Sequence, residues 1–255
     1  MIDTHTHIYF KEDYKEEISD VVDRMLKEGV SHVILPNVNM ESLDEVKEFH
    51  YSFPEISTMA IGLHPTEVKD DWRDVLANFK EELRQGDYKA IGETGIDLHW
   101  ETENLQQQKE AFEHQLSMAE QSGLPVIIHS RDALEETLDS ISKMSPSVPL
   151  IFHSFTGGKE AVKRIREICD PFFGINGVVT YKNAPELREA LKEISTERIL
   201  LETDAPYLTP VPFRGRRNET SFIGFVRDKI GETLLIHPSE IEEITDRNAR
   251  QLFRL

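Results

Sequence analysis

Cysteine is nearly absent from this sequence: Cys169 is the only one in 255 residues, so no disulfide can form within the chain. The chain also lacks an apolar run long enough to cross a bilayer, and its N-terminus has no basic segment followed by an apolar core. These absences argue against a disulfide-stabilised secreted domain and against a membrane protein. They predict a soluble cytoplasmic protein. We also expect a monomer or a weak homo-oligomer.

Positive charge is scarce. The chain has 29 Lys and Arg residues against 47 Asp and Glu residues, which gives a formal net charge of -18. A large negative field repels polyanions, so broad nonspecific binding to nucleic acid or to anionic lipid is disfavoured. Any polyanionic substrate must therefore meet local cations, bound metal ions or both.

Linker-like composition is missing as well, because the sequence has no Ser/Gly-rich stretch, no low-complexity run and no short internal repeat. A chain of 255 residues fits one barrel-sized domain as well as two small ones. Since nothing in the composition separates two parts, we expect a single domain that spans residues 1–255.

Short apolar runs alternate with longer amphipathic stretches along the whole chain. The strand-like runs cover residues 1–5, 32–36, 56–63, 89–93, 125–129, 149–153, 171–175 and 198–202. The helix-like stretches cover residues 15–27, 42–50, 72–84, 105–122, 132–142, 159–168, 185–194, 221–230 and 238–253. Eight strand-then-helix units over about 250 residues are typical of a (β/α)8 TIM barrel. A doubly wound open sheet is the alternative, but it usually has a Gly-rich phosphate loop after its first strand, and here that strand ends in histidines.

The pair His5 and His7 is the first chemical signal in the chain. In an extended strand, side chains two residues apart project to the same face, so both imidazoles can hold one divalent cation. Taken alone, such a pair is also explained by a tag remnant or by a solvated turn. The ends of the later strands favour the metal interpretation.

Four of the later strand-like runs end in residue types that bind metals, namely Glu93, His129, His153 and Asp204. Taken singly, each could be a buried histidine bonded to the backbone or a carboxylate that caps the next helix. Their intervals of 36, 24 and 51 residues correspond to one, one and two strand-helix units. The ligand-bearing strands would then be 1, 4, 5, 6 and 8, all opening on the catalytic face of a closed barrel.

Four imidazoles and two carboxylates, with no thiolate, exceed what one structural zinc ion needs and predict a binuclear centre. Glu93 has two oxygens and can bridge two ions. The remaining ligands divide between the ions as follows: His5, His7 and Asp204 on one, His129 and His153 on the other. Two cations about 3.5 to 4 Å apart can activate a shared water for displacement at phosphorus, which implies hydrolysis. The imidazoles favour Zn or Mn, whereas a phosphodiester substrate favours Mg or Mn.

The sequence resembles the TatD-type metal-dependent deoxyribonucleases, a branch of the amidohydrolase superfamily, over essentially its whole length. The matching segments are residues 3–7 (DTHTH), 62–65 (GLHP), 91–97 (IGETGID), 126–131 (VIIHSR), 153–157 (HSFTG), 200–208 (LLETDAPYL) and 214–219 (RGRRNE). The resemblance implies the barrel, two divalent ions and hydrolysis of DNA phosphodiester bonds, typically from a 3′ end. It also implies ligand roles for the same six residues. Glu93 stands where many superfamily relatives have a carboxylated lysine, which disfavours a dihydroorotase-like or urease-like reaction.

Other residues have chemistry that suits a DNA substrate. Asp204 can take the proton from the attacking water and is our candidate general base. His64 and Arg131 are candidates for neutralising a substrate phosphate, although His64 could be a loop residue fixed by Pro65, and Arg131 could pair with a neighbouring carboxylate. Residues 205–218 contain no acidic residue, and they supply three further candidate phosphate contacts: Arg214, Arg216 and Arg217. The alternative for these arginines is a solvated loop paired with Glu219.

Three functions are compatible with the sequence. A DNA phosphodiesterase comes first, and hydrolysis of an amide, a lactone or a small phosphoester on the same barrel comes second, because a fold and a metal centre do not define the substrate. A non-enzymatic barrel with closed structural metal sites comes third. The local departures from the TatD pattern, Thr94 and the pair His99 and Trp100, bear on substrate detail.

Overall fold

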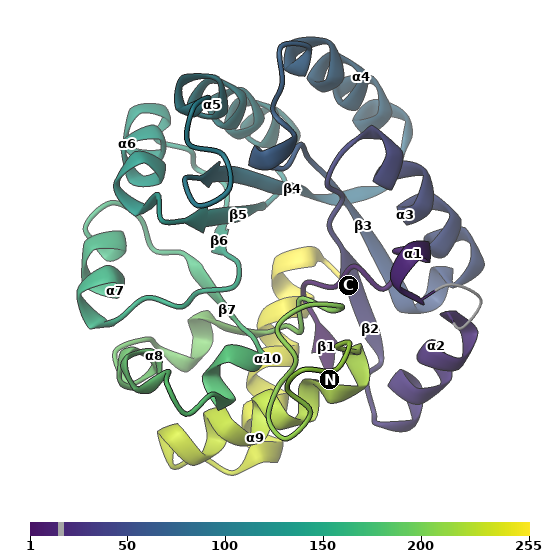
Figure 1. Cartoon of the computed structure of the whole chain (residues 1–255), viewed down its shortest axis with the longest axis vertical. Helices are drawn as coiled ribbons and strands as arrows, with labels where there is room; N and C mark the ends of the chain where they lie inside the picture. Colours follow the sequence, from purple (N-terminus) through teal and green to yellow (C-terminus); the bar gives the residue numbers. More distant parts are fainter. Residues whose placement is uncertain (15–17) are drawn as a thin grey trace.

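In the described residues, eight parallel strands pair in the order of the sequence around a central barrel, with the helices outside (Figure 1). The computed structural model describes residues 1–14 and 18–255. The strands are β1 (Ile2–Asp3), β2 (His32–Leu35), β3 (Ser57–Ile61), β4 (Tyr88–Asp97), β5 (Val126–Arg131), β6 (Leu150–Phe152), β7 (Phe172–Ile175) and β8 (Ile199–Leu201). The predicted TIM barrel is confirmed.

The seam between the first and last strands is joined by backbone hydrogen bonds. The N–H of Thr4 donates to the carbonyl of Leu201 at 2.9 Å, and the N–H of Asp204 donates to the carbonyl of His5 at 2.9 Å. These bonds hold the matching segments of residues 3–7 and 200–208 side by side. The seam therefore brings a candidate ligand from residue 5 next to one from residue 204.

The helices follow the predicted order around the barrel. Their bounds are α1 (Lys11–Tyr14), α2 (Ile18–Lys27), α3 (Met40–Ser52), α4 (Trp72–Gln85), α5 (Leu105–Ser122), α6 (Leu134–Met144), α7 (Lys159–Arg166), α8 (Pro185–Leu191), α9 (Ile223–Leu234) and α10 (Pro238–Phe253). Short 3-10 turns lie between them: η2 (Pro54–Ile56), η3 (Pro65–Glu67), η4 (Gly177–Thr180), η5 (Thr196–Arg198) and η6 (Thr220–Phe222). Residues 15–17 of the first predicted helix lie outside the described residues. None of the described helices has the length and apolar character that crossing a bilayer requires.

The inside of the barrel is filled by one small or branched apolar side chain from most strands. These side chains are Ile2, Ile34, Ala60, Ala90, Ile127, Ile151 and Leu200, and Ala249, Leu252 and Phe253 of α10 pack against them. In Figure 1, α10 (yellow) crosses the central opening behind the strands. One end of the barrel is thus closed by apolar packing, as expected for a barrel whose interior is a packed core. The larger apolar cluster lies between the strands and the surrounding helices.

Strand β4 is longer than the sequence predicted: we expected it to end at Glu93, and it continues to Asp97. The extension pairs in parallel with β5, with Gly95 opposite His129 and Asp97 opposite Arg131. Gly95 has a φ of 144°, and a Cβ there would collide with the carbonyl oxygen of His129. Because glycine tolerates this conformation and close approach, the strand can run on past Glu93.

Candidate metal centre

Strand alternation explains why ionisable side chains meet at the open end of the barrel. Ile127 and Ile151 point into the barrel interior. Residues two positions further along an extended chain point the same way, and these are His129 and His153. Leu200 is likewise an interior residue, and the same register carries Glu202 toward the open end of the barrel.

His5 and His7 follow a short strand and are held by bonds to the end of β8. The carboxylate of Asp3 accepts hydrogen bonds from the backbone N–H of His5 at 3.2 Å and from that of Thr203 at 3.0 Å. The N–H of His7 donates to the carbonyl of Ala205 at 2.8 Å. Burial raises the pKa of Asp3 to about 7. The segment that carries both imidazoles is therefore fixed to the segment that carries Asp204.

Glu93 lies at the centre of the site, with a different set of imidazoles at each of its two oxygens. Its Oε2 atom is 3.2 Å from Nε2 of His5 and 3.8 Å from Nε2 of His7. Its Oε1 atom is 2.7 Å from Nδ1 of His129 and 3.4 Å from Nε2 of His153. One carboxylate oxygen thus faces each pair of histidines, the arrangement that a bridging ligand between two ions requires.

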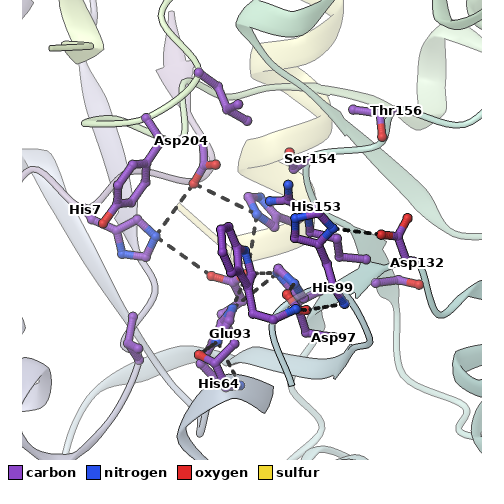
Figure 2. Close-up of a pocket in the computed structure, with 18 of the residues that line it drawn as sticks. His7, His64, Glu93, Asp97, His99, Asp132, His153, Ser154, Thr156 and Asp204 are labelled. Atoms are coloured by element: carbon purple, nitrogen blue, oxygen red, sulfur yellow. Dashed lines mark hydrogen bonds and ion pairs between the residues drawn. The ribbon is translucent and has the colours of Figure 1, made fainter. Parts of the chain in front are cut away.

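Asp204 faces both sets across from Glu93, as Figure 2 shows. Its Oδ1 atom is 3.7 Å from Nε2 of His5, 3.7 Å from Nε2 of His7 and 4.0 Å from Nε2 of His153. The residue adopts a φ of 57°, a left-handed conformation that Asp tolerates better than most residues. The structure therefore brings all six candidate ligands from the sequence into one cluster.

The ionisation of the cluster follows from burial and from mutual charge. Burial alone would raise the pKa of Glu93, but His153, His64 and His5 hold it well below its ordinary value. Burial lowers the pKa of His129, and its hydrogen bonds to Asp97 and Glu93 outweigh this effect and raise it to about 9. Burial raises the pKa of Asp204 to about 7. Concentrated negative charge in a buried place is a feature that divalent cations stabilise.

Hydrogen bonds at the far side of a histidine ring show which nitrogen is left for a ligand. The hydroxyl of Tyr9 donates to the carbonyl of Pro36, so its oxygen can accept from Nδ1 of His7 at 2.9 Å. With the proton on Nδ1, the Nε2 lone pair of His7 faces the cluster. That atom lies 3.3 Å from Nε2 of His5, so the two rings converge on one point.

His64 has the opposite arrangement. Its Nδ1 atom accepts a hydrogen bond from the backbone N–H of Thr66 at 3.3 Å, so its proton is on Nε2 when the ring is neutral. That N–H points at Glu93, 3.5 Å from Oε1. His64, Glu93 and His129 are close enough to form a metal-binding group, but the Thr66 bond favours His64 as a hydrogen-bond donor at the edge of the site.

Glu202 lies behind two of the candidate ligands. Its Oε1 atom accepts from the N–H of Ser154 at 2.6 Å and is 3.2 Å from Nδ1 of His153. A Cβ at residue 174 would collide with this carboxylate, so Gly174 makes room for it. Burial raises the pKa of Glu202 to about 7. Nδ1 of His5 and Nδ1 of His153 are buried, and neither makes a hydrogen bond of good geometry among the described residues, although Glu202 lies close to the second.

The donor set fits divalent metal ions. Within the described part of the chain, three groups of His and carboxylate atoms lie close enough to share an ion: His5, His7 and Glu93; His64, Glu93 and His129; and His5, His153 and Glu202. Imidazole nitrogen and carboxylate oxygen suit Zn²⁺ and Mn²⁺, and the carboxylates also suit Mg²⁺. The two groups that share Glu93 correspond to its two oxygens.

A pocket of about 940 Å³ opens over this cluster. Its lining includes His7, His64, Glu93, His129, His153 and Asp204, and also Phe10, Trp100, Arg131 and Tyr207. The guanidinium of Arg131 lies 5.7 Å from the ring of Trp100 and makes no ion pair within residues 1–14 and 18–255. Asp132, a carboxylate that could have paired with it, contacts His99 at 3.0 Å instead.

The arginines of residues 205–218 do not appear among the lining residues of this pocket. Arg214 lies 4.3 Å from the ring of Tyr181, and Arg216 lies 5.7 Å from the ring of Phe213. Arg217 donates to the backbone carbonyl of Asp13 and to the carboxylate of Glu219. The loop thus packs its arginines on aromatic rings and on neighbouring acceptors.

Comparison with known proteins gives the family. A family model described as TatD related DNase matches residues 2–254. The chain belongs to the TatD family. It is 36% identical to the "uncharacterized metal-dependent hydrolase YabD" of Bacillus subtilis (strain 168), and the alignment covers 100% of this chain and 99% of the relative. It is 30% identical to the "uncharacterized metal-dependent hydrolase TatD" of Mycobacterium tuberculosis, with 100% and 98% covered.

A solved structure supports the same family assignment. The crystal structure of YJJV, a TatD homolog from Escherichia coli K12, superimposes with a TM-score of 0.90 at 25% identity, and covers 100% of this chain and 98% of that one. The resemblance inferred from the motifs is therefore confirmed, and so is the TatD barrel.

In this TatD-family chain, three further side chains lie within 3.2 Å of a ring nitrogen of a candidate ligand and were not predicted from the sequence: Tyr9, Asp97 and Glu202. Two of them had a detectable signal. Asp97 is four residues after Glu93, and Glu202 is two residues before Asp204, so each shares the strand register of a candidate ligand. Tyr9 has the same two-residue spacing from His7, but it lies in a turn, where strand register does not predict side-chain contacts.

Proposed function

We propose that this chain, a metal-dependent hydrolase of the TatD family, cleaves phosphodiester bonds in DNA, working from a 3′ end through a binuclear metal centre. The observation that supports this most directly is the two-sided position of Glu93, with His5 and His7 at Oε2 and His129 and His153 at Oε1. A structural site would be closed by protein ligands, whereas this cluster opens into a large pocket.

The ligands would divide between two ions, with Glu93 shared. We assign His5, His7 and Asp204 to one ion and His129 and His153 to the other. Bound divalent ions of this kind polarise phosphoryl oxygens and lower the pKa of a water molecule toward neutrality. The protein holds the donors in place through the seam bonds between β1 and β8 and through the pairing of β4 with β5.

Asp204 is our candidate general base. Its Oδ1 atom is the carboxylate oxygen that faces His5, His7 and His153 at 3.7 to 4.0 Å, so a water held between the two sets would lie within its reach. It can accept the proton of the attacking water and release it when the product leaves. A general base contributes about 10²- to 10⁴-fold to a rate.

The pocket rim suits a single strand of DNA. Two groups at the pocket wall can bind a phosphate: the Nε2–H of His64, a hydrogen-bond donor, and the positively charged guanidinium of Arg131. We propose that they bind the phosphate at the cleavage site. Phe10, Trp100 and Tyr207 line the same pocket and offer ring faces on which bases can stack. We propose that Arg214 and Arg216 contact phosphates further along the strand, outside the pocket.

The chain supplies every group named here, so the proposal needs no second subunit, and we propose that it acts as a monomer or a weak homo-oligomer. The single cysteine supports a location in the cytoplasm.

The test is a substrate panel with metal-stripped protein. Oligonucleotides labelled at the 5′ end, with free or blocked 3′ ends, are compared with amide, lactone and small phosphoester substrates before and after Mg²⁺, Mn²⁺ or Zn²⁺ is restored. We expect metal-dependent loss of nucleotides from free 3′ ends. A chain that hydrolyses an amide or lactone with restored metal, and leaves DNA intact, would contradict the proposal.

A further inference from the structure

Asp97 is buried at the end of β4, and its two oxygens have different partners. Oδ1 accepts hydrogen bonds from the backbone N–H groups of His99 at 2.9 Å and of Trp100 at 2.7 Å. Backbone N–H groups can only donate, so Oδ1 must be an acceptor. Oδ2 lies 2.9 Å from Nε2 of His129.

The backbone of Asp97 is fixed as firmly as its side chain. Its N–H donates to Oε1 of Gln108 at 2.8 Å, and Nε2 of Gln108 donates back to its carbonyl at 3.1 Å. Gln108 belongs to α5 and is itself buried. The carboxylate is thus held in one place, beside one nitrogen of one candidate ligand.

This contact decides how the ring of His129 is used. An ionised carboxylate accepts and cannot donate, so the nitrogen that faces Asp97 carries a proton. The other nitrogen, Nδ1, faces the metal cluster: it is 2.7 Å from Oε1 of Glu93 and 3.3 Å from Nε2 of His64. Because Glu93 is also a carboxylate, both ring nitrogens can donate while no ion is bound. An ion at the cluster needs the lone pair of a ring nitrogen, and it displaces the proton of Nδ1, which points at the site, while the proton on Nε2 stays bonded to Asp97.

We propose that Asp97 is a positioning residue that selects Nδ1 of His129 as the metal-binding nitrogen by holding the ring proton on Nε2. The inference rests on the proposed role of His129 as a ligand. Tyr9 has the corresponding role for His7: it holds the ring proton on Nδ1, which leaves Nε2 for a metal ion. Figure 2 shows Asp97 and His7 on opposite sides of Glu93.

The variant Asp97→Asn separates positioning from packing, because the amide has nearly the same shape and one acceptor fewer. The two backbone N–H groups keep its oxygen at the Oδ1 position, so its NH₂ group must face Nε2 of His129. That nitrogen then has to accept, and the ring proton moves to Nδ1. The lone pair that should bind the ion is lost from the site, while the turn that carries His99 and Trp100 keeps its bonds.

The experiment uses the full chain loaded with diamagnetic Zn²⁺ and with ¹⁵N-labelled histidine. Long-range ¹H–¹⁵N correlation spectra report which ring nitrogen carries a proton, and His129→Ala assigns the signals. We expect protonated Nε2 and metal-bound Nδ1 for His129 in the wild type. In Asp97→Asn we expect the proton on Nδ1, and calorimetric titration should show Zn²⁺ affinity at one site reduced about 10- to 100-fold.

Asp132→Asn is the matched control, because it changes another aspartate that faces a histidine in the same pocket, at 3.0 Å from His99. It should leave the His129 signals and the Zn²⁺ affinity unchanged. A wild-type spectrum with the proton on Nδ1 would overturn the inference, even if Asp97→Asn failed to fold. An unchanged tautomer or an unchanged affinity in folded Asp97→Asn would also overturn it. If His129→Ala kept both ions at full affinity, the proposed metal centre itself would be wrong.

Discussion

The two ends of the barrel are built from the same strands and differ completely in chemistry. At the end that α10 covers, the inward side chains are Ile127, Ile151 and their apolar neighbours, and they pack without polar partners. Two residues further along the same strands, the inward side chains are His129 and His153, which contact Glu93. The closed end uses strand alternation for stability, and the open end uses it to assemble charge.

Substitutions at the two ends should therefore affect different properties of the protein. Changes at the closed end remove apolar packing and should lower the free energy of unfolding. Changes at the open end remove groups that repel one another or that lack full hydrogen bonding, so they should affect metal binding and catalysis more than stability.

Replacing the central carboxylate should have the largest effect. In Glu93→Gln, the amide offers one acceptor oxygen in place of two, so it cannot serve both sets of imidazoles. We expect hydrolysis to fall to the level of a blank and the bound metal, measured by elemental analysis, to fall below two ions per chain. Glu103→Gln, an exposed change in the loop after β4, is the control and should behave as wild type. Two tightly bound ions in Glu93→Gln would refute the bridging role.

Asp204→Asn should come next. Asn tolerates the left-handed backbone at this position, where φ is 57°, so the fold should be retained. Without a carboxylate to accept the proton, kcat should fall about 10²- to 10⁴-fold, with a smaller change in KM. Steady-state kinetics on a short single-stranded DNA measure both. A kcat within threefold of wild type would assign the general base elsewhere.

At the closed end, Ile151→Ala should lower stability and leave metal binding and catalysis intact. Ile151 is 2% exposed and packs in the barrel interior, so the truncation should lower the free energy of unfolding by about 2 to 5 kcal/mol. Urea denaturation measures the loss. Metal affinity and kcat at 25 °C should stay within twofold of wild type, and Ile151→Val should cost only about 0.5 to 1.5 kcal/mol. A large loss of metal affinity in folded Ile151→Ala would show that the two ends are not separate.

The smallest effects should distinguish the pocket rim from the outer loop. Arg131→Ala should raise KM about 10-fold even for a dinucleotide, because a charged hydrogen bond to phosphate contributes about 1.5 to 3 kcal/mol. The double variant of Arg214 and Arg216 to Ala should raise KM only for longer strands and should reduce the salt dependence of binding. Equal effects of both variants on the dinucleotide would place the outer arginines at the cleavage site.

Much of the barrel could be predicted because strand and helix periodicities alternate so regularly. The predicted helices at residues 105–122 and 238–253 coincide with α5 and α10. The candidate ligands were found because each one follows an apolar run at the same end of its strand. That regularity needs no knowledge of tertiary contacts.

Other features depend on tertiary contacts and could not be predicted. The extension of β4 requires Gly95 to lie against His129, and the position of Asp97 requires Gln108 from α5. The choice of ring nitrogen in each histidine is decided by a partner on another element or turn. The arginines of residues 205–218 look like a basic loop in the sequence, yet Arg214 and Arg216 lie against aromatic rings.

In the proposed site, the two oxygens of Glu93 serve two ions. Anomalous X-ray diffraction from crystals of the wild-type chain soaked in Mn²⁺ or Zn²⁺ tests it directly. We predict two peaks about 3.5 to 4 Å apart, one beside His5 and His7 and the other beside His129 and His153. A single peak at the open end of the barrel, or none, would contradict the claim.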